Sequence, residues 1–126
     1  MSPEAVNYIG IAEAMLARAH RSFLAEIYED AARSAYLAML NAARAIIFDK
    51  EGLATKTHSG VRTKMYDMLR GGLVFDKQLV DFLATAFETK QSVDYGPEIV
   101  LVDRTQAEDY LNRAAAFLAA AKAVCG

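Results

Sequence analysis

Alanine dominates this sequence, and proline is nearly absent from it. Alanine occupies 24 of the 126 positions, and neither of the two prolines, Pro3 and Pro97, interrupts a helical pattern. Because alanine is the strongest helix former and proline the weakest, this balance predicts an all-α fold. Hydrophobic residues at 54% and charged residues at 24% are typical of a folded domain, and the length predicts a single one over residues 1–126.

Three features predict a cytoplasmic protein without a membrane anchor. No apolar run approaches the length of about 18–20 residues that a membrane span needs. The N-terminal residues include Glu4 and Asn7 but no basic stretch before an apolar core, so no signal peptide is expected. The single cysteine, Cys125, has no partner for an internal disulfide or a cysteine-based zinc site.

The pattern of glycines and polar loops predicts an up-and-down bundle of about five helices. They are expected at about residues 3–24, 30–50, 60–70, 76–93 and 106–124. Ser2 and Asp76 are expected to cap the first and fourth helices, and Gly52 to end the second. Thr105 and Glu108 have the spacing of a capping box at the start of the fifth.

Two helices differ in the width of their apolar faces. The fifth has one apolar stripe, formed by Ala107, Tyr110, Leu111, Ala114, Phe117, Leu118 and Ala121. The second is apolar almost all round and is therefore predicted to lie at the centre; its apolar residues are Ala31, Ala35, Tyr36, Ala38, Met39, Leu40, Ala42, Ala43, Ile46 and Ile47. Its narrow polar stripe, Arg33, Asn41 and Arg44, spans about 80° and is expected to line a cleft or a dimer seam.

Lys90 lies on the predicted core stripe of the fourth helix, where an apolar residue is expected. The stripe comprises Leu79, Phe82, Leu83, Ala86, Phe87 and Val93. In one interpretation Lys90 favours the helix dipole, extends its stem to solvent and pairs with Asp94, four residues on. In the other, a cation is required in a cleft between helices, since an unpaired buried ammonium is costly.

The segment from Lys56 to Arg70 is basic although the whole chain has a net charge of −2. Its cations are Lys56, Arg62, Lys64 and Arg70, and its one anion is Asp67. Such a strip attracts phosphate or an acidic partner, or it is an ordinary solvated helix face.

The run Lys56-Thr57-His58-Ser59-Gly60 is the densest polar cluster and precedes the third helix. Helix N-terminal amides, together with Lys56 and the two hydroxyls, would form an anion site. Alternatively, Thr57 or Ser59 caps the helix and His58 packs over it. The other histidine, His20, is expected at the surface.

Sequence patterns for metal and cofactor sites are missing. Neither His20 nor His58 has a glutamate three residues before it, so the Glu-x-x-His pattern of di-iron bundles does not occur. No Walker or dinucleotide glycine loop and no Gly-x-Ser-x-Gly elbow occurs either. We therefore expect no metal and no cofactor.

Three separated motifs resemble prokaryotic HEPN-domain proteins and occur in the same order. They are the run Ser34-Ala35-Tyr36-Leu37-Ala38-Met39-Leu40-Asn41-Ala42-Ala43-Arg44-Ala45, the loop Lys56-Thr57-His58-Ser59-Gly60-Val61, and Lys90-x-x-x-Asp94-Tyr95. The resemblance implies a compact helical bundle, usually a dimer. It also implies pairing with a small nucleotidyltransferase in toxin–antitoxin-like systems, or a place in RNA-targeting defence. Many members of the family are metal-independent ribonucleases.

The ribonucleases of this family carry Arg-x(4–6)-His at the end of the fourth helix. The arginine neutralises the scissile phosphate and the histidine moves protons. In this sequence the arginine position holds Lys90, and the histidine positions hold Tyr95, Gly96 and Pro97. Tyrosine, with a usual pKa of about 10, is a poor substitute for imidazole, and lysine lacks the bidentate fork of arginine.

These observations favour a non-catalytic HEPN module that binds a nucleotide or an RNA phosphate, a nucleotidyltransferase-like partner, or both, as a homodimer. The residues expected to bind the ligand are Lys56, Thr57, His58, Ser59, Arg44, Lys90, Asp94 and Tyr95. One alternative is an altered ribonuclease that uses Lys90, Tyr95 and His58. Another is a purely structural helical adaptor that dimerises through its alanine-rich second helix.

Overall fold

The computed structural model describes residues 1–96 and 101–126. Within those residues it contains five α-helices and no strands, which confirms the predicted all-α bundle. The helices are α1 (Pro3–Leu24), α2 (Tyr28–Glu51), α3 (His58–Arg70), α4 (Lys77–Tyr95) and α5 (Arg104–Cys125). No described helix combines the length and the hydropathy that crossing a membrane requires.

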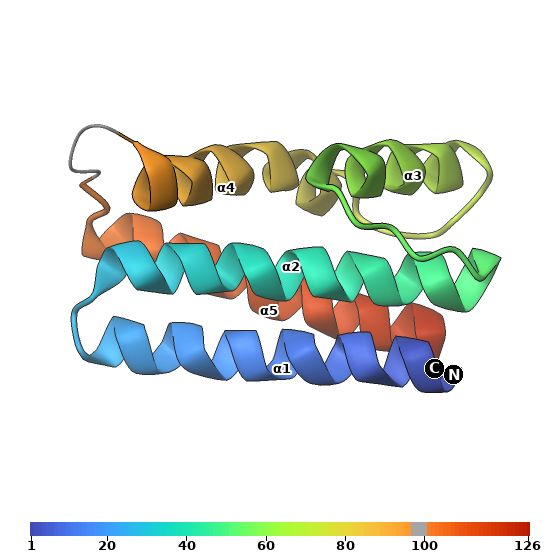
Figure 1. The fold of residues 1–126 in the computed structure, drawn as a ribbon, viewed down its shortest axis with the longest axis horizontal. Helices are drawn as coiled ribbons and strands as arrows, with labels where there is room; N and C mark the ends of the chain where they lie inside the picture. Colours follow the sequence, from blue (N-terminus) through green and yellow to red (C-terminus); the bar gives the residue numbers. More distant parts are fainter. Residues whose placement is uncertain (97–100) are drawn as a thin grey trace.

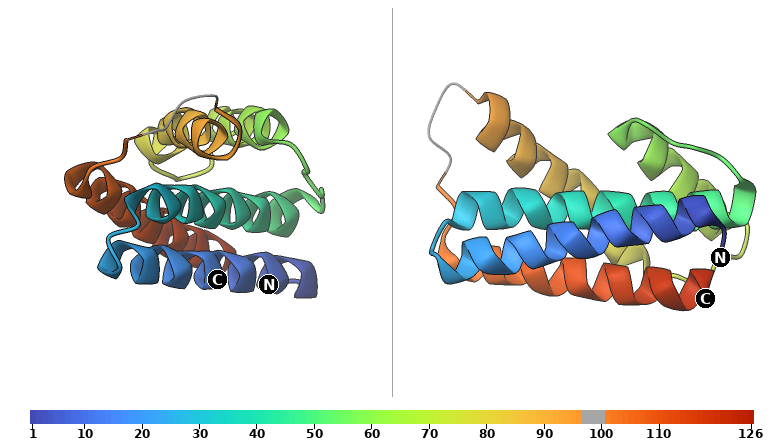
Figure 2. Two further views of the ribbon diagram at one scale, coloured as in Figure 1. Left: turned by 60° about the vertical axis from the view of Figure 1, so that its left-hand side comes forward. Right: turned by 60° about the horizontal axis from the view of Figure 1, so that its bottom comes forward.

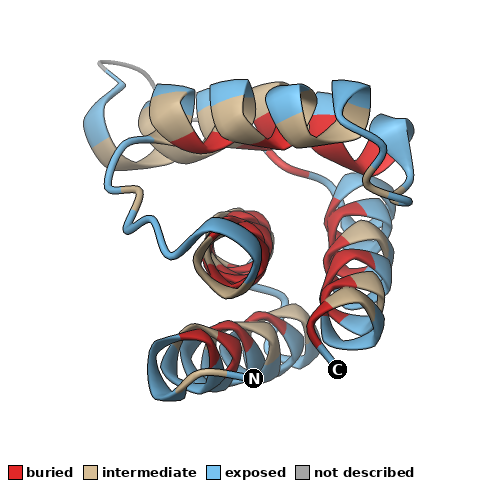
Figure 3. Ribbon diagram, turned by 90° about the vertical axis from the view of Figure 1, so that its right-hand side faces the viewer, coloured by how far each residue is buried: buried red, intermediate tan, exposed pale blue. Residues whose placement is uncertain are grey.

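Helix α2 lies at the centre of the bundle. Helices α1 and α5 run along it, and α3 and α4 cover another of its sides (Figures 1 and 3). The two chain termini lie at the same end of the molecule (Figures 1 and 2). All ten residues that the sequence predicts to be apolar around α2 are buried, which confirms its central position.

The up-and-down alternation has one exception, because α3 runs in the same direction as α2 (Figure 1). Residues 52–57 double back along α2 instead of turning tightly. Arg44 of α2 holds this segment by donating to the backbone carbonyls of Thr55 at 2.9 Å and Lys56 at 2.7 Å. The N-terminus of α3 therefore lies beside the middle of α2, where α4 also passes.

The predicted ends of the helices agree with the structure at three caps. Ser2 Oγ accepts from the amide of Ala5 at 3.1 Å, and Asp76 accepts from the amide of Gln78 at 2.9 Å. Gly52 ends α2 with a φ of 65°, in the left-handed region that glycine adopts at low cost.

Four helices extend beyond their predicted bounds: α2 begins at Tyr28 rather than Asp30, α3 begins at His58 rather than Gly60, α4 ends at Tyr95 rather than Val93, and α5 begins at Arg104 rather than Gln106. The extension of α3 follows from its cap, since Thr57 accepts from the amide of Gly60 at 3.0 Å. Pro97, which the sequence places between the helical patterns, lies outside the described residues.

The predicted capping box at Thr105 is wrong. Asp103 Oδ1 accepts from the Gln106 amide at 2.8 Å, and Gln106 Oε1 accepts from the Asp103 amide at 3.0 Å. Starting the helix two residues earlier places Val102 and Ala107 at the two positions of a hydrophobic staple, and both are buried. The predicted core stripe of α5 is buried throughout, as expected.

Candidate functional site

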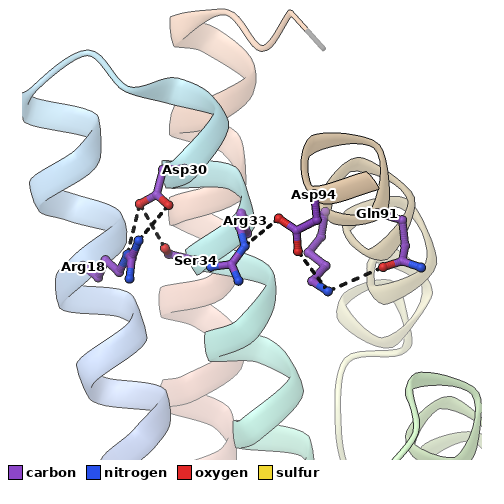
Figure 4. A network of polar contacts seen from close by, with 7 residues as sticks. Arg18, Asp30, Arg33, Ser34, Gln91 and Asp94 are labelled. Atoms are coloured by element: carbon purple, nitrogen blue, oxygen red, sulfur yellow. Dashed lines mark hydrogen bonds and ion pairs between the residues drawn. The ribbon is translucent and has the colours of Figure 1, made fainter. Parts of the chain in front are cut away.

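Two cations and one carboxylate meet between α2 and α4, near the C-terminal end of α4 (Figure 4). Arg33 Nε donates to Asp94 Oδ1 at 2.8 Å, and Lys90 Nζ lies 3.1 Å from Asp94 Oδ2. The predicted pairing of Lys90 with Asp94 is therefore confirmed, and Arg33 of the α2 polar stripe joins it. We call these three residues the Arg33–Asp94–Lys90 cluster.

This cluster is largely buried and carries an excess positive charge. The side chains of Arg33, Lys90 and Asp94 are 30%, 17% and 17% exposed. Burial by itself would raise the pKa of Asp94, but the hydrogen bonds from Lys90 and Arg33 outweigh it and lower that pKa below its usual 3.8. Asp94 is thus ionised at neutral pH, and two cations share one negative charge.

An exposed aromatic ring lies next to the cluster. Tyr95, the last residue of α4, is 75% exposed, and its ring centroid lies 5.4 Å from Lys90 Nζ. Gln91 Oε1 lies 3.5 Å from the same ammonium. The Lys90 ammonium is therefore placed between a half-buried carboxylate and an exposed ring, which is a suitable arrangement for an anion attached to a flat group.

His58 joins three helices at the centre of the molecule. Its Nδ1 lies 2.9 Å from Tyr36 Oη of α2, and its ring stacks on Phe87 of α4 with centroids 3.9 Å apart. Burial, and secondarily the charge of Arg62, lowers the pKa of His58 below 6.5. His58 is therefore neutral at pH 7, and its ring contacts the chain's own side chains.

Arg44 and Asn41 are also engaged with the chain itself. Arg44 holds the 52–57 segment, as described above, and its Nη1 lies 3.5 Å from Asn41 Oδ1. Asn41 is 7% exposed and donates to the carbonyl of Leu37 at 2.8 Å. Arg44 therefore fixes the loop before α3, and Asn41 accepts a hydrogen bond from Arg44.

The basic segment is partly neutralised. Two of its four cations form ion pairs, Lys64 with Glu51 at 2.7 Å and Arg70 with Asp67. Within the described residues, Lys56 and Arg62 have no carboxylate within ion-pair distance. Lys56 and Ser59 are exposed, whereas the Thr57 hydroxyl is occupied as the cap of α3.

The residues predicted to bind a ligand therefore fall into two groups. Arg33, Lys90, Asp94 and Tyr95 lie together, whereas Lys56, Thr57, His58, Ser59, Arg44 and Asn41 surround the start of α3. Along the axis of α2, Arg33 and Arg44 are about 16 Å apart. A single phosphate is therefore too small to contact both of these arginines.

The sequence did not reveal two of the polar partners. Tyr36 was predicted only as a core residue, although its hydroxyl binds His58. Asp30 accepts hydrogen bonds from Ser22 Oγ at 2.6 Å and from Arg18 Nη2 at 3.1 Å. The bond from Arg18, drawn in Figure 4, joins α1 to α2 beside the cluster. No local pattern marks these pairs, because their members lie on different helices.

Comparison with models of known protein families identifies the family of this chain. Residues 5–124 match the model described as HEPN domain. The chain belongs to the HEPN family. This membership confirms the resemblance seen in its three motifs, and it indicates a role related to nucleotides or RNA in general. A comparison with curated proteins gives no match.

In this HEPN domain, Lys90 and Asp94 at the end of α4 meet Arg33 of α2, in the segment where the family resemblance predicts the ribonuclease motif. Tyr95 and the exposed Gly96 stand at histidine positions of that motif, and Pro97 lies outside the described residues. His58 contacts α4 at Phe87, about 4.5 Å along the helix from Lys90. Among residues 1–96 and 101–126, no three His, Cys, Asp or Glu side chains are grouped as metal ligands.

Proposed function

We propose that this chain is a non-catalytic HEPN module that binds a phosphate group of a nucleotide or an RNA at the Arg33–Asp94–Lys90 cluster. One observation carries the proposal: Arg33 and Lys90 converge from two helices on a single carboxylate. Charge-assisted hydrogen bonds from a guanidinium and an ammonium are the contacts that proteins use to hold phosphate oxygens.

The surroundings of the cluster fit a nucleotide better than free phosphate. The ring of Tyr95 is exposed and lies beside Lys90. Bases stack on such rings in single-stranded nucleic-acid binding, where one base contributes about 1–3 kcal/mol. In the proposed complex, Arg33 and Lys90 hold the phosphate and Tyr95 stacks on the base.

The same geometry argues against catalysis. Proton transfer needs a group whose pKa lies near the working pH and that reaches the substrate. His58 Nδ1 is bonded to Tyr36 and its ring is covered by Phe87, so we assign His58 a structural role. Tyr95 offers a phenol, which is a poorer proton-transfer group than an imidazole.

Self-association is part of the proposal. Four of the large apolar side chains that are more than half exposed belong to one end of the bundle, namely Leu24, Ile27, Tyr95 and Leu101. They stand where α1 and α4 end and close to where α2 and α5 begin (Figure 1). Exposed apolar side chains gathered at one end favour an interface. A nucleotidyltransferase-like partner from a toxin–antitoxin or defence system stays a prediction, tested by co-purification.

The proposal is tested by titrating AMP, ATP and a short single-stranded RNA against the wild-type protein and Lys90→Ala. We expect measurable binding by the wild type and an affinity at least about tenfold lower for Lys90→Ala. Lys77→Ala is the matched control, because Lys77 pairs with Asp81 on the same helix in the same i,i+4 arrangement. Equal affinities of the wild type and Lys90→Ala, or no binding, would contradict the proposal.

Incubation with RNA tests the ribonuclease alternative. We expect RNA to stay intact without metal. Cleavage that is lost in His58→Ala would instead identify an altered ribonuclease.

A further inference from the structure

Asp94 occupies a place that a ligand anion would take. Its two carboxylate oxygens are divided between the two cations, with Oδ1 at 2.8 Å from Arg33 Nε and Oδ2 at 3.1 Å from Lys90 Nζ. A phosphate held by the same two side chains would present two oxygens in the same way. The carboxylate and an incoming phosphate would therefore compete for the same donors.

We propose that Asp94 is an internal counter-anion that weakens ligand binding, so that an incoming phosphate binds by displacing its carboxylate from Arg33 and Lys90. This inference rests on the proposed phosphate site and specifies how that site is regulated.

The exchange of anions is favourable because neither Arg33 nor Lys90 is left without a counter-anion. Two cations held together in a half-buried place without an anion would repel each other and lose solvation. Asp94 supplies the negative charge in the free protein, and the phosphate supplies it in the complex. A ligand thus gains the attraction of both cations but must first break two ion pairs.

Asp94 also joins α2 to α4, since Arg33 belongs to α2 and Asp94 to α4 (Figure 4). In the described chain no other ion pair joins these two helices. When phosphate takes the place of the carboxylate, it becomes the link between Arg33 on α2 and Lys90 on α4. Binding therefore changes which group connects the two helices.

The chain offers a matched pair of variants for the test. Asp94→Asn removes the charge and preserves the shape of the side chain. Asp81→Asn makes the same change in net charge on the same helix, at another Lys–Asp pair spaced four residues apart, away from the cluster. The probes are AMP, whose phosphate carries about two negative charges at pH 7.5, and 3′,5′-cyclic AMP, whose phosphate carries one.

We expect Asp94→Asn to bind AMP at least about tenfold more tightly than the wild type. The gain for cyclic AMP should be smaller, because the added attraction grows with the charge of the ligand. Asp81→Asn should bind both probes as the wild type does.

Two results would overturn the inference. If the wild type binds AMP and Asp94→Asn binds it equally or more weakly, Asp94 positions the cations for the ligand and does not compete with it. The proposed function would survive that result. If the wild type and both variants fail to bind, the proposed function and the inference fail together.

Asp94→Asn leaves two neighbouring cations without a counter-ion, so its folding requires a separate measurement. Its melting temperature should rise more steeply with added inorganic phosphate than that of the wild type or Asp81→Asn, because ligand binding stabilises the folded state. If Asp94→Asn does not fold, Asp94→Ser is titrated in its place and interpreted by the same outcomes.

Discussion

Tyr36 and His58 show how a buried polar pair can fix the position of a helix. Burial raises the pKa of Tyr36 to about 12, so its phenol stays neutral, and burial together with Arg62 lowers the pKa of His58. A neutral pair suits the contact with Phe87, whereas an imidazolium would add a second positive charge close to Arg62. Burial and the charge of Arg62 therefore favour the neutral form of His58 in the folded state.

The lowered pKa of His58 predicts that the stability of the fold depends on pH. Since the folded state lowers the pKa of His58, the unfolded state takes up a proton first as the pH falls below about 6.5. The stabilising contribution is thus complete above that pH and is lost as the pH falls towards the lower, folded-state pKa. Asp30 and Asp94, whose pKa values lie below 3.8, lose theirs only at lower pH.

Urea unfolding between pH 7 and pH 5 measures this effect. The free energy of unfolding should decrease with falling pH in the wild type and in the control His20→Gln, since His20 is exposed. The decrease should be smaller in His58→Gln, which keeps hydrogen-bonding capacity but does not titrate. An unchanged slope in His58→Gln would show that another group is responsible.

At the scale of the element, the start of α5 allows the sharpest test of a helix end. Asp103→Ala removes the bond that the Asp103 side chain accepts from the Gln106 amide, one of the two bonds of the capping box, and should lower the free energy of unfolding by about 1 kcal/mol. Thr105→Ala changes an exposed residue within the first turn and should have little effect. Denaturant titration compares the two variants, and the reverse order would place the cap at Thr105.

The same helix shows what the sequence could and could not specify. The 3.6-residue periodicity identified the core residues of α5 other than Cys125, because apolar burial dictates that spacing. It did not choose between Asp103-x-x-Gln106 and Thr105-x-x-Glu108, since both have acceptable capping chemistry. The decision came from packing: the observed cap places Val102 and Ala107 in the core.

At the scale of the whole molecule, the close packing of α2 depends on small side chains. Ala38 lies in the core with no exposed surface, so Ala38→Leu should destabilise the protein by about 1–3 kcal/mol through overpacking. Ala116→Leu on the exposed face of α5 is the control and should have little effect. Thermal unfolding checks this, and equal melting temperatures would contradict a tightly packed centre.

Which faces meet was the part that the sequence could not specify. The Lys90–Asp94 pair was predictable because its members are four residues apart on one helix. Arg33 and Asp94 are separated by 61 residues, and Tyr36 and His58 by 22. Periodicity gives each helix a buried face but does not say which helix covers it. The return of residues 52–57 along α2 brings His58 to Tyr36.

The central question for the whole molecule is where a phosphate binds. Titration of AMP into isotope-labelled protein, followed by amide and side-chain NMR signals, measures this directly. We predict that the largest shifts occur at Arg33, Lys90, Asp94 and Tyr95, at the end of α4. Shifts confined to Lys56, Thr57 and Ser59 at the start of α3, or no shifts at all, would contradict the assignment of the site to the Arg33–Asp94–Lys90 cluster.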